Sequence, residues 1–361
     1  MLFSFFASLV DSYSFLNVFK YLTFRTGLSV MTSLVVVFLI GGPLIKIFSR
    51  KQITGPIRQD GPLDHIIKKS GTPTMGGIII IIGMIAGTLL WADLSNVYIW
   101  TLIFVSLSLG ILGFTDDLLK IKYENSRGLN SKLKFLGQLV IGVITIFLLI
   151  KYSNHEYLYN LYFPFFKNLI IQMGLFFFPF ALFVIIGSSN AVNLTDGLDG
   201  LATVPVMLVA LSFTLISYVV GNTIFAEYLQ LQYIADVGEI SIFCGSIVGS
   251  CLGFLWYNAP PAKIFMGDTG SLSLGGSLAA VAIIVKHEIV LAIIGGLFVL
   301  ETVSVIIQVI SFKLTGKRVF MMAPIHHHFE KKGWAESTIV IRFWIIAIIL
   351  ALIGLATLKL R

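Results

Sequence analysis

Long apolar runs, broken by short polar and charged clusters, dominate this sequence of 361 residues. Apolar residues make up 57% of the chain and charged residues only 12%, whereas an ordinary soluble domain has about 25% charged residues. Because a membrane-spanning helix needs roughly 20 residues, this composition is enough for about ten spans. We therefore expect an all-α integral membrane protein with transmembrane helices at 27–47, 75–92, 97–115, 134–151, 169–187, 200–220, 240–257, 270–286, 288–310 and 338–358.

The distribution of Lys and Arg predicts the orientation of these spans. Together with the adjoining span ends, the connections after the odd-numbered spans hold 18 of the 25 basic residues, so these connections should be cytoplasmic and both termini outside. The net charge of +7 is scattered between apolar runs, which favours a membrane surface or an anionic substrate over nucleic acid. We expect one membrane domain, 1–361, with cytoplasmic loops at 48–74, 116–133, 188–199, 258–269 and 311–337.

Small residues inside the spans indicate packing rather than chemistry. Gly245, Gly249 and Gly253 recur at intervals of four and should line one face of a closely packed helix. Cys244 and Cys251, the two cysteines, lie seven residues apart, too far along a helix to form a disulfide. The sequence has neither of the glycine-rich phosphate-binding motifs, so any nucleotide must be held by other means.

Five aspartates are concentrated in or beside three of the expected cytoplasmic connections. Carboxylates so near hydrocarbon are costly unless they are solvated, paired or bound to a metal. Asp116 and Asp117 lie where a span ends, in the sequence DDLLK, with Lys120 one turn further on if the helix continues. A solvated helix end is the structural alternative, but acids are unfavourable at a helix C-terminus, which favours a functional role.

Two further clusters carry the other three aspartates. The sequence NAVNLTDGLDGLA contains Asn190, Asn193, Asp196 and Asp199 and no basic residue. A helix cap explains one of its aspartates well but two poorly. Asp268, in FMGDTGSL, leads into the next span, where it fits either a helix cap or a metal ligand.

Basic and imidazole side chains lie on the same expected side of the membrane. Lys69 and Thr74 precede one span, Lys132 precedes another, and APIHHHFE carries the triplet His326–His328. A solvated loop or a zinc site is an alternative for the histidines, but contact with an anionic or polar ligand fits better because zinc sites usually have spaced ligands. Acids, Lys and His on one membrane face predict Mg²⁺-dependent phosphoryl transfer between anionic substrates.

At these residues the chain resembles a known superfamily. The motifs GTPTMGG, DDLLK, NAVNLTDGLDGLA, FMGDTGSL and APIHHHFE are similar to those of the polyprenyl-phosphate N-acetylhexosamine-1-phosphate transferases. Within that superfamily they resemble the phospho-N-acetylmuramoyl-pentapeptide transferases of peptidoglycan synthesis. The resemblance runs from about residue 20 to the C-terminus and keeps the order of the five motifs.

The resemblance implies a reaction, a cofactor and a location. Phospho-MurNAc-pentapeptide would pass from UDP-MurNAc-pentapeptide to undecaprenyl phosphate, giving lipid I and UMP, with Mg²⁺ required. The protein would be a homodimer in the bacterial cytoplasmic membrane, with both termini periplasmic and with a uridine site that binds nucleoside antibiotics.

The resemblance also implies roles for individual residues. Asp268 matches the metal ligand, and Asp116 and Asp117 match the catalytic aspartates. The nucleotide and substrate pocket would be formed by Lys69, Thr74, Asn193, Asp196, Asp199, Asn258 and Phe265, and we add as substrate contacts Lys120, Lys132, Asn190, His326, His327 and His328. Phe265 fits either stacking on uracil or simple packing.

Two mechanisms and two other functions are compatible with these residues. In a one-step reaction Asp116 deprotonates or orients the lipid phosphate, which then attacks the UDP-linked sugar phosphate. In a two-step reaction an aspartate attacks first and a covalent intermediate forms. The other functions are a sister GlcNAc-1-phosphate transferase and a transporter. Glu301, the one acid expected well inside hydrocarbon, would pair locally or line the cytoplasmic cleft.

Overall fold

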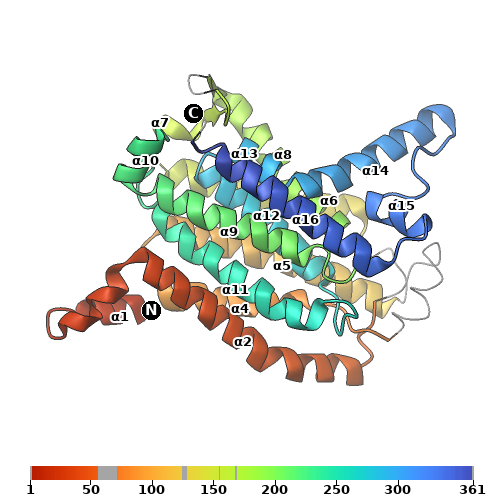
Figure 1. The fold of residues 1–361 in the computed structure, drawn as a ribbon, viewed down its shortest axis with the longest axis horizontal. Helices are drawn as coiled ribbons and strands as arrows, with labels where there is room; N and C mark the ends of the chain where they lie inside the picture. The colour runs from red at the N-terminus through yellow and green to blue at the C-terminus, as the bar shows by residue number, and fades with distance from the viewer. Residues whose placement is uncertain (1, 56–70, 124–127, 154, 167–168, 360–361) are drawn as a thin grey trace.

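The computed structural model describes residues 2–55, 71–123, 128–153, 155–166 and 169–359 (Figure 1). Within these residues, nine helices are long and apolar enough to cross a membrane. They are α2 (Leu22–Arg50), α5 (Val97–Lys122), α6 (Ser131–Tyr152), α8 (Phe177–Thr195), α9 (Thr203–Val220), α11 (Ile240–Asn258), α12 (Gly267–Ile284), α14 (Gly296–Thr315) and α16 (Glu336–Ala356). A tenth apolar helix, α4 (Gly77–Trp91), has 15 residues. The chain is a multi-pass, all-α integral membrane protein, as its sequence predicts.

One expected span is two helices. Residues 288–310 form α13 (Glu288–Ile294) and then α14, and the helix is interrupted at Gly295. The interruption falls at the pair Gly295-Gly296, where the lack of side chains weakens helix propensity. The hydrophobic run predicted the apolar character of this segment correctly, but the expectation of a single straight span was wrong.

The expected cytoplasmic connections are shorter in the structure than in the prediction. Helix α5 continues to Lys122 and α8 to Thr195, so much of 116–133 and 188–199 is helical. The connection 311–337 includes the end of α14 and a short helix, α15 (Ile325–Lys331). Asp116, Asp117 and Asp268 therefore lie on helices, and Asp196 and Asp199 lie in the short turn after α8, rather than in long loops.

Short elements cap the ends of the bundle. They are α1 (Leu2–Ser8), a 3₁₀ helix η1 (Ser14–Lys20), α7 (His155–Leu158), η2 (Gly174–Phe176), α10 (Thr223–Leu229) and η3 (Val237–Glu239). The strands β1 (Asn160–Tyr162) and β2 (Ile170–Gln172) form an antiparallel hairpin in which Leu161 pairs with Ile171. The sequence did not predict this hairpin, whose strands have only three residues each.

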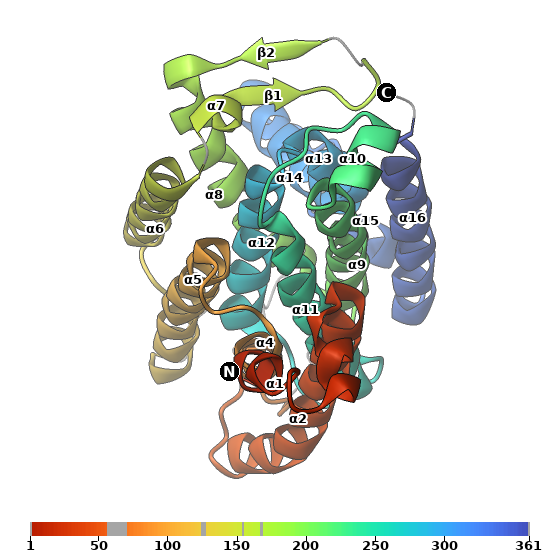
Figure 2. The same cartoon turned by 90° about the vertical axis from the view of Figure 1, so that its left-hand side faces the viewer.

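Helix α12 forms the centre of the bundle, with α5 and α6 on one side and α16 on the other (Figure 2). Nearly all of its residues are buried, and many are Gly, Ala or Ser. A Cβ atom on Gly276 would lie 2.0 Å from a methyl of Leu109 in α5, so a larger residue there would have to displace that buried side chain. Similarly, a Cβ on Gly249 would lie 2.1 Å from the Val30 carbonyl oxygen in α2, which confirms close packing along the glycine face of α11.

A short backbone junction fixes the region where the site lies. The amides of Gly76 and Gly77 donate to the carbonyls of Phe265 and Met266, both at 2.8 Å, and the Phe265 amide donates to the Pro73 carbonyl at 2.9 Å. These bonds hold the start of α4 against the start of α12. Since α5 ends beside them, three helix termini converge at one end of the bundle.

Candidate active site

Asp116 and Asp117 lie in the last two turns of α5, and both are buried. Because the helix continues past them, Lys120 lies one turn beyond Asp116, as the DDLLK spacing predicted. Its Nζ lies 2.5 Å from Asp116 Oδ2 and 3.0 Å from Asp268 Oδ2. Lys120 therefore neutralises carboxylates from two helices rather than forming a surface pair within one.

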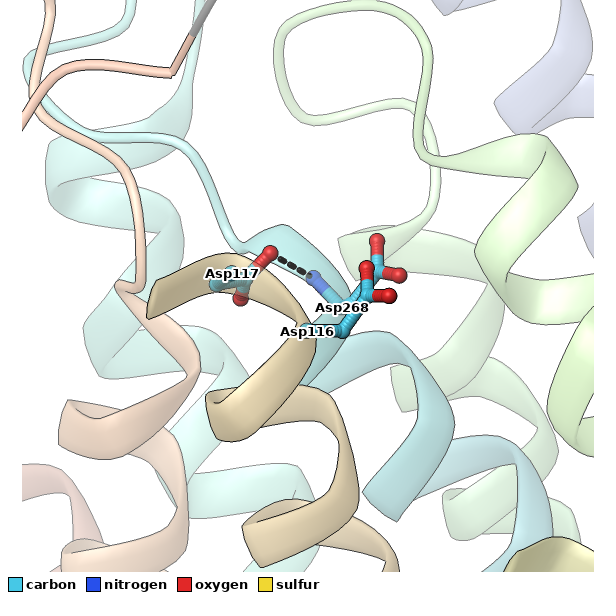
Figure 3. Close-up of side chains that lie close together, drawn as sticks. All are labelled: Asp116, Asp117 and Asp268. Atoms are coloured by element: carbon cyan, nitrogen blue, oxygen red, sulfur yellow. Dashed lines mark hydrogen bonds between the residues drawn. The ribbon is translucent and has the colours of Figure 1, made fainter. Parts of the chain in front are cut away.

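Asp117 caps the neighbouring helix α12. Its Oδ1 accepts from the Asp268 amide at 3.2 Å (Figure 3). Its Oδ2 accepts from the Thr269 amide at 3.0 Å and from the Thr269 hydroxyl at 2.8 Å. A carboxylate at a helix N-terminus satisfies free N–H groups and opposes the positive end of the dipole. Both oxygens of Asp117 are thus occupied in holding α5 against α12.

Asp268 is not a cap, so that alternative from the sequence is wrong. It lies inside the first turn of α12, and its carboxylate points away from the helix end toward cations and an amide. Lys120 and Lys134 form ion pairs with its Oδ2, and Asn193 Nδ2 donates to its Oδ1 at 2.8 Å. Asn193 also donates to Ser271 Oγ at 2.9 Å, which fixes the amide between α8 and α12.

Lys134, which the sequence analysis did not single out, is the lysine of α6 that pairs with Asp268. Both lysines lie in the first turn of α6, but residues two apart lie on nearly opposite faces of a helix. Lys132 is exposed, and its amide donates to the Asn130 side chain, which caps α6. Helix periodicity distinguishes the two lysines, but only the rotation of α6 about its axis determines which one faces Asp268.

The three aspartates form a site that can bind a metal ion. One carboxylate oxygen from each of Asp116, Asp117 and Asp268 lies within 4.8 Å of the others. An all-oxygen donor set with carboxylates is the kind that hard divalent cations such as Mg²⁺ prefer. Asp116 Oδ1 also accepts from the Leu129 amide at 2.8 Å, which keeps the carboxylate turned toward the cluster.

Asp196 and Asp199 lie in the turn between α8 and α9. Burial, together with the negative charges of Asp268 and Asp117, raises the pKa of Asp196 from its ordinary value of 3.8 to about 7. Asp199 accepts from the Ala262 amide at 2.9 Å, and its own amide donates to Glu336 of α16 at 2.9 Å. Neither aspartate caps α9, so the cap alternative is wrong for both.

Several other predicted residues are used in contacts within the protein. The Asn190 side chain donates to Gln138 Oε1 and to a carbonyl of its own helix. The Asn258 side chain accepts from Thr203 and donates to the Ile264 carbonyl, and it is buried. Thr74 and Phe265 lie at the junction between α4 and α12, and the ring of Phe265 is half-buried. Lys69 lies outside the described residues.

The three histidines have three different environments. His326 is fully buried, and its Nδ1 lies 3.1 Å from Glu301 Oε2. The Nδ1 atom of His327 lies 2.6 Å from Glu330 within the same helix, and His328 Nδ1 accepts from the Met321 amide at 3.1 Å. The triplet therefore does not form a single anion-binding cluster, and His326 is the member that packs against the turn carrying Asp196 and Asp199.

Comparison of the sequence with known proteins identifies the family. A model described as "Glycosyl transferase family 4" matches residues 99–286, from α5 to the end of α12, and "Phospho-N-acetylmuramoyl-pentapeptide-transferase signature 1" matches residues 69–81. A phospho-N-acetylmuramoyl-pentapeptide-transferase of Pelagibacter ubique (strain HTCC1062) is 68% identical over the whole of both chains. The chain belongs to the phospho-N-acetylmuramoyl-pentapeptide-transferase family.

Other members of the phospho-N-acetylmuramoyl-pentapeptide-transferase family are similar over almost the same length. The relative from Maricaulis maris (strain MCS10) is 56% identical over the whole of both chains. The relative from Phenylobacterium zucineum (strain HLK1) is 55% identical over 96% of this chain and 95% of its own. The family signature covers the junction between α4 and α12, and the larger model covers the helices that carry the three aspartates.

Proposed function

We propose that this protein transfers phospho-MurNAc-pentapeptide from UDP-MurNAc-pentapeptide to undecaprenyl phosphate, giving lipid I and UMP. The observation that supports this most strongly is the convergence of Asp116, Asp117 and Asp268 with Lys120 and Lys134 at one end of the bundle, next to the family signature. The relatives from Pelagibacter ubique and Maricaulis maris are named as this transferase, and this chain matches each of them over its full length. A sister GlcNAc-1-phosphate transferase and a transporter are the competing functions.

The proposal includes Mg²⁺, with Asp268 as a ligand and Asp116 completing the donor set. When bound, Mg²⁺ supplies positive charge that lets two phosphorylated substrates approach and stabilises departing UMP. Lys120 and Lys134 stand within ion-pair distance of Asp268, so they can transfer part of their interaction to the diphosphate of the donor substrate. Each carboxylate oxygen of Asp117 accepts a hydrogen bond from a main-chain amide of α12, which favours a structural role for that carboxylate.

We favour the one-step mechanism, in which Asp116 orients or deprotonates the lipid phosphate. Asp116 differs from Asp117 in having an oxygen whose contacts are with lysines rather than with helix amides. A lipid phosphate is itself an oxygen nucleophile, so a covalent intermediate is not required. In the two-step alternative, enzyme given the UDP-linked substrate alone would release one UMP per site and carry a phospho-sugar on an aspartate.

Substrate contacts follow from the positions around the three aspartates. Thr74, Asn193, Asp196 and Phe265 lie on segments that border the cluster, and we propose that they contact the nucleotide. Lys69 remains a proposal from the resemblance, and His327 and His328 remain proposals from the chemistry of the histidine triplet. Asn190 and Asn258 have amides engaged within the protein, so we propose that they support the pocket instead of contacting substrate directly.

The proposed location is the bacterial cytoplasmic membrane, with the site on the cytoplasmic side and a homodimer as the working form. The proposed function can be tested by measuring UMP release by purified protein in detergent. UMP release from UDP-MurNAc-pentapeptide is expected only when both undecaprenyl phosphate and Mg²⁺ are present. Turnover of UDP-GlcNAc instead would support the sister enzyme, and vesicle uptake of substrate without UMP release would support the transporter.

A further inference from the structure

Glu301 of α14 is a buried acid with no role in the reaction described above. Its side chain has no exposed surface. Within the described part of the chain its one ion-pair contact is with His326, at 3.1 Å between Oε2 and Nδ1. Burying an isolated carboxylate without a partner costs several kcal/mol of free energy, so the nearby imidazole offsets part of the cost of burying Glu301.

His326 joins three separate segments of the chain. It lies in the first turn of α15, where Ile325 and Phe329 pack onto a small core that includes Leu198 and Leu201. A Cβ atom on Gly197 would lie 2.3 Å from His326 Nε2, so the imidazole packs directly against the backbone of Gly197 and would have to shift if that residue were larger. The imidazole therefore has Nδ1 against α14 and Nε2 against the turn between α8 and α9.

Both ring nitrogens of His326 and both carboxylate oxygens of Glu301 are buried without a hydrogen-bond partner among the described residues, so the 3.1 Å contact between Nδ1 and Oε2 is within ion-pair distance but is not an aligned hydrogen bond. Of the two nitrogens, Nε2 is the one that faces the turn between α8 and α9. Buried polar nitrogens are nearly always partnered, so an unpartnered one indicates a ligand or water that completes it. The turn that it faces carries Asp196, which we place at the nucleotide. A polar atom of the bound substrate is the partner of suitable chemistry.

We propose that Glu301 is a positioning residue: it holds His326 by Nδ1 and thereby presents Nε2, past Gly197, to a polar atom of the nucleotide-linked substrate. This inference rests on the proposed function. The adjacent pair, His327 with Glu330, has a similar contact of 2.6 Å but lies wholly within α15. It provides a matched His–Glu pair that does not connect α14 to the turn.

A double-mutant cycle tests the inference through UMP release. We expect Glu301→Ala to lower kcat by about 10- to 100-fold, the usual effect of removing a residue that orients a functional histidine, with a smaller change in KM. His326→Ala should have a similar effect, and the double variant should be no worse than either single variant, because both changes remove the same oriented group. Glu301→Gln keeps an oxygen beside Nδ1 and should recover part of the rate.

The control is Glu330→Ala, whose effect should simply add to that of His326→Ala. Thermal unfolding of each variant shows whether it is folded, and if Glu301→Ala is not, the isosteric Glu301→Gln carries the comparison. Additive losses for Glu301→Ala and His326→Ala, or a Glu301→Ala enzyme with the wild-type kcat, would overturn the proposal.

A second measurement does not depend on turnover. In protein labelled with ¹⁵N-histidine, the His326 signals, identified by their loss in His326→Ala, should report one protonated Nδ1 in the wild type and a changed Nδ1/Nε2 pattern in Glu301→Ala. An unchanged pattern contradicts the positioning role. If wild-type protein releases no UMP, the proposed function fails, while this signature still tests the contact between Glu301 and His326.

Discussion

The side chains of Asp117 and Asp268 lie close together in space but have different partners. Asp117 accepts two amides and a hydroxyl at the start of α12, whereas Asp268 contacts Lys120, Lys134 and Asn193. The cluster contains three carboxylates and two lysines. Removing either acid leaves equal numbers of acids and lysines, so the two residues can be compared without a difference in net charge.

We expect Asp117→Ala to destabilise the protein by about 1 to 2 kcal/mol, because it leaves the first amides of α12 without an acceptor. Asp268→Asn should abolish UMP release with little loss of stability, since its carboxylate caps nothing. Thermal unfolding in detergent and the UMP assay measure the two effects. Equal melting temperatures for Asp117→Ala and wild type would contradict the capping role, and normal turnover by Asp268→Asn would exclude its metal role.

Asp196 should make stability depend on pH. Its pKa is raised from 3.8 to about 7, mainly by burial, so the folded protein holds this proton more tightly than the unfolded chain does. The resulting stabilisation is full below about pH 4 and is lost as the pH rises to about 7. In metal-free buffer, the melting temperature of Asp196→Asn relative to wild type should therefore increase between about pH 5 and pH 8, and a constant difference would contradict this.

Helices α5 and α12 approach so closely that one methyl group should disturb the site. A Cβ atom on Gly113 would lie 2.2 Å from the Asp268 carbonyl oxygen, a main-chain atom that cannot move alone. Gly113→Ala must therefore shift α5, and with it Asp116 and Asp117, away from α12. Gly113 of α5 therefore helps to set the positions of Asp116 and Asp117 relative to Asp268.

We expect Gly113→Ala to cost about 1 to 3 kcal/mol of stability, as overpacking of a tight contact usually does, and to abolish most UMP release. The matched control is Gly27→Ala in α2, where no atom lies within 4 Å of the added Cβ. That variant should be as stable as wild type or slightly more stable, because alanine favours helix. Similar melting temperatures and rates for the two variants would show that the contact between α5 and α12 tolerates separation.

In the molecule as a whole, the first and last long helices have their outer ends on one side of the bundle, and the cluster of Asp116, Asp117 and Asp268 lies on the other (Figure 1). Helix α2 begins, and α16 ends, at the same side of the bundle, and α5 ends at the opposite side (Figure 1). An even number of crossings produces this arrangement. The excess of Lys and Arg in the connections near the aspartates predicts that their side faces the cytoplasm.

Cysteine labelling in intact cells tests this orientation. Both native cysteines are fully buried, so they should not react with a membrane-impermeant maleimide. Ser12→Cys, at an exposed position before α2, should be labelled without permeabilisation, and Thr315→Cys, exposed at the end of α14, only after it. The reverse pattern would invert the topology.

The amino-acid sequence by itself determined the class of protein and nearly all of the helices. Apolar runs of about 20 residues specify membrane helices because the hydrocarbon core of the bilayer holds no water, so the backbone N–H and C=O groups must hydrogen-bond to one another within the segment. The sequence also singled out Asp116, Asp117 and Asp268, which the structure brings together, because a carboxylate near hydrocarbon is costly unless it is paired, solvated or bound to a metal. It further predicted that Lys120 lies one turn from Asp116, because the spacing within one helix is fixed.

Only the tertiary structure decided which of these groups meet and in what role. Asp117 as the cap of α12, Lys134 rather than Lys132 beside Asp268, and His326 between Glu301 and Gly197 all join different segments. Such contacts depend on how each helix is rotated about its axis and how deeply it lies in the bundle. Local sequence periodicity fixes which side chains share a helix face, but packing among all of the helices sets the partner that each face finds.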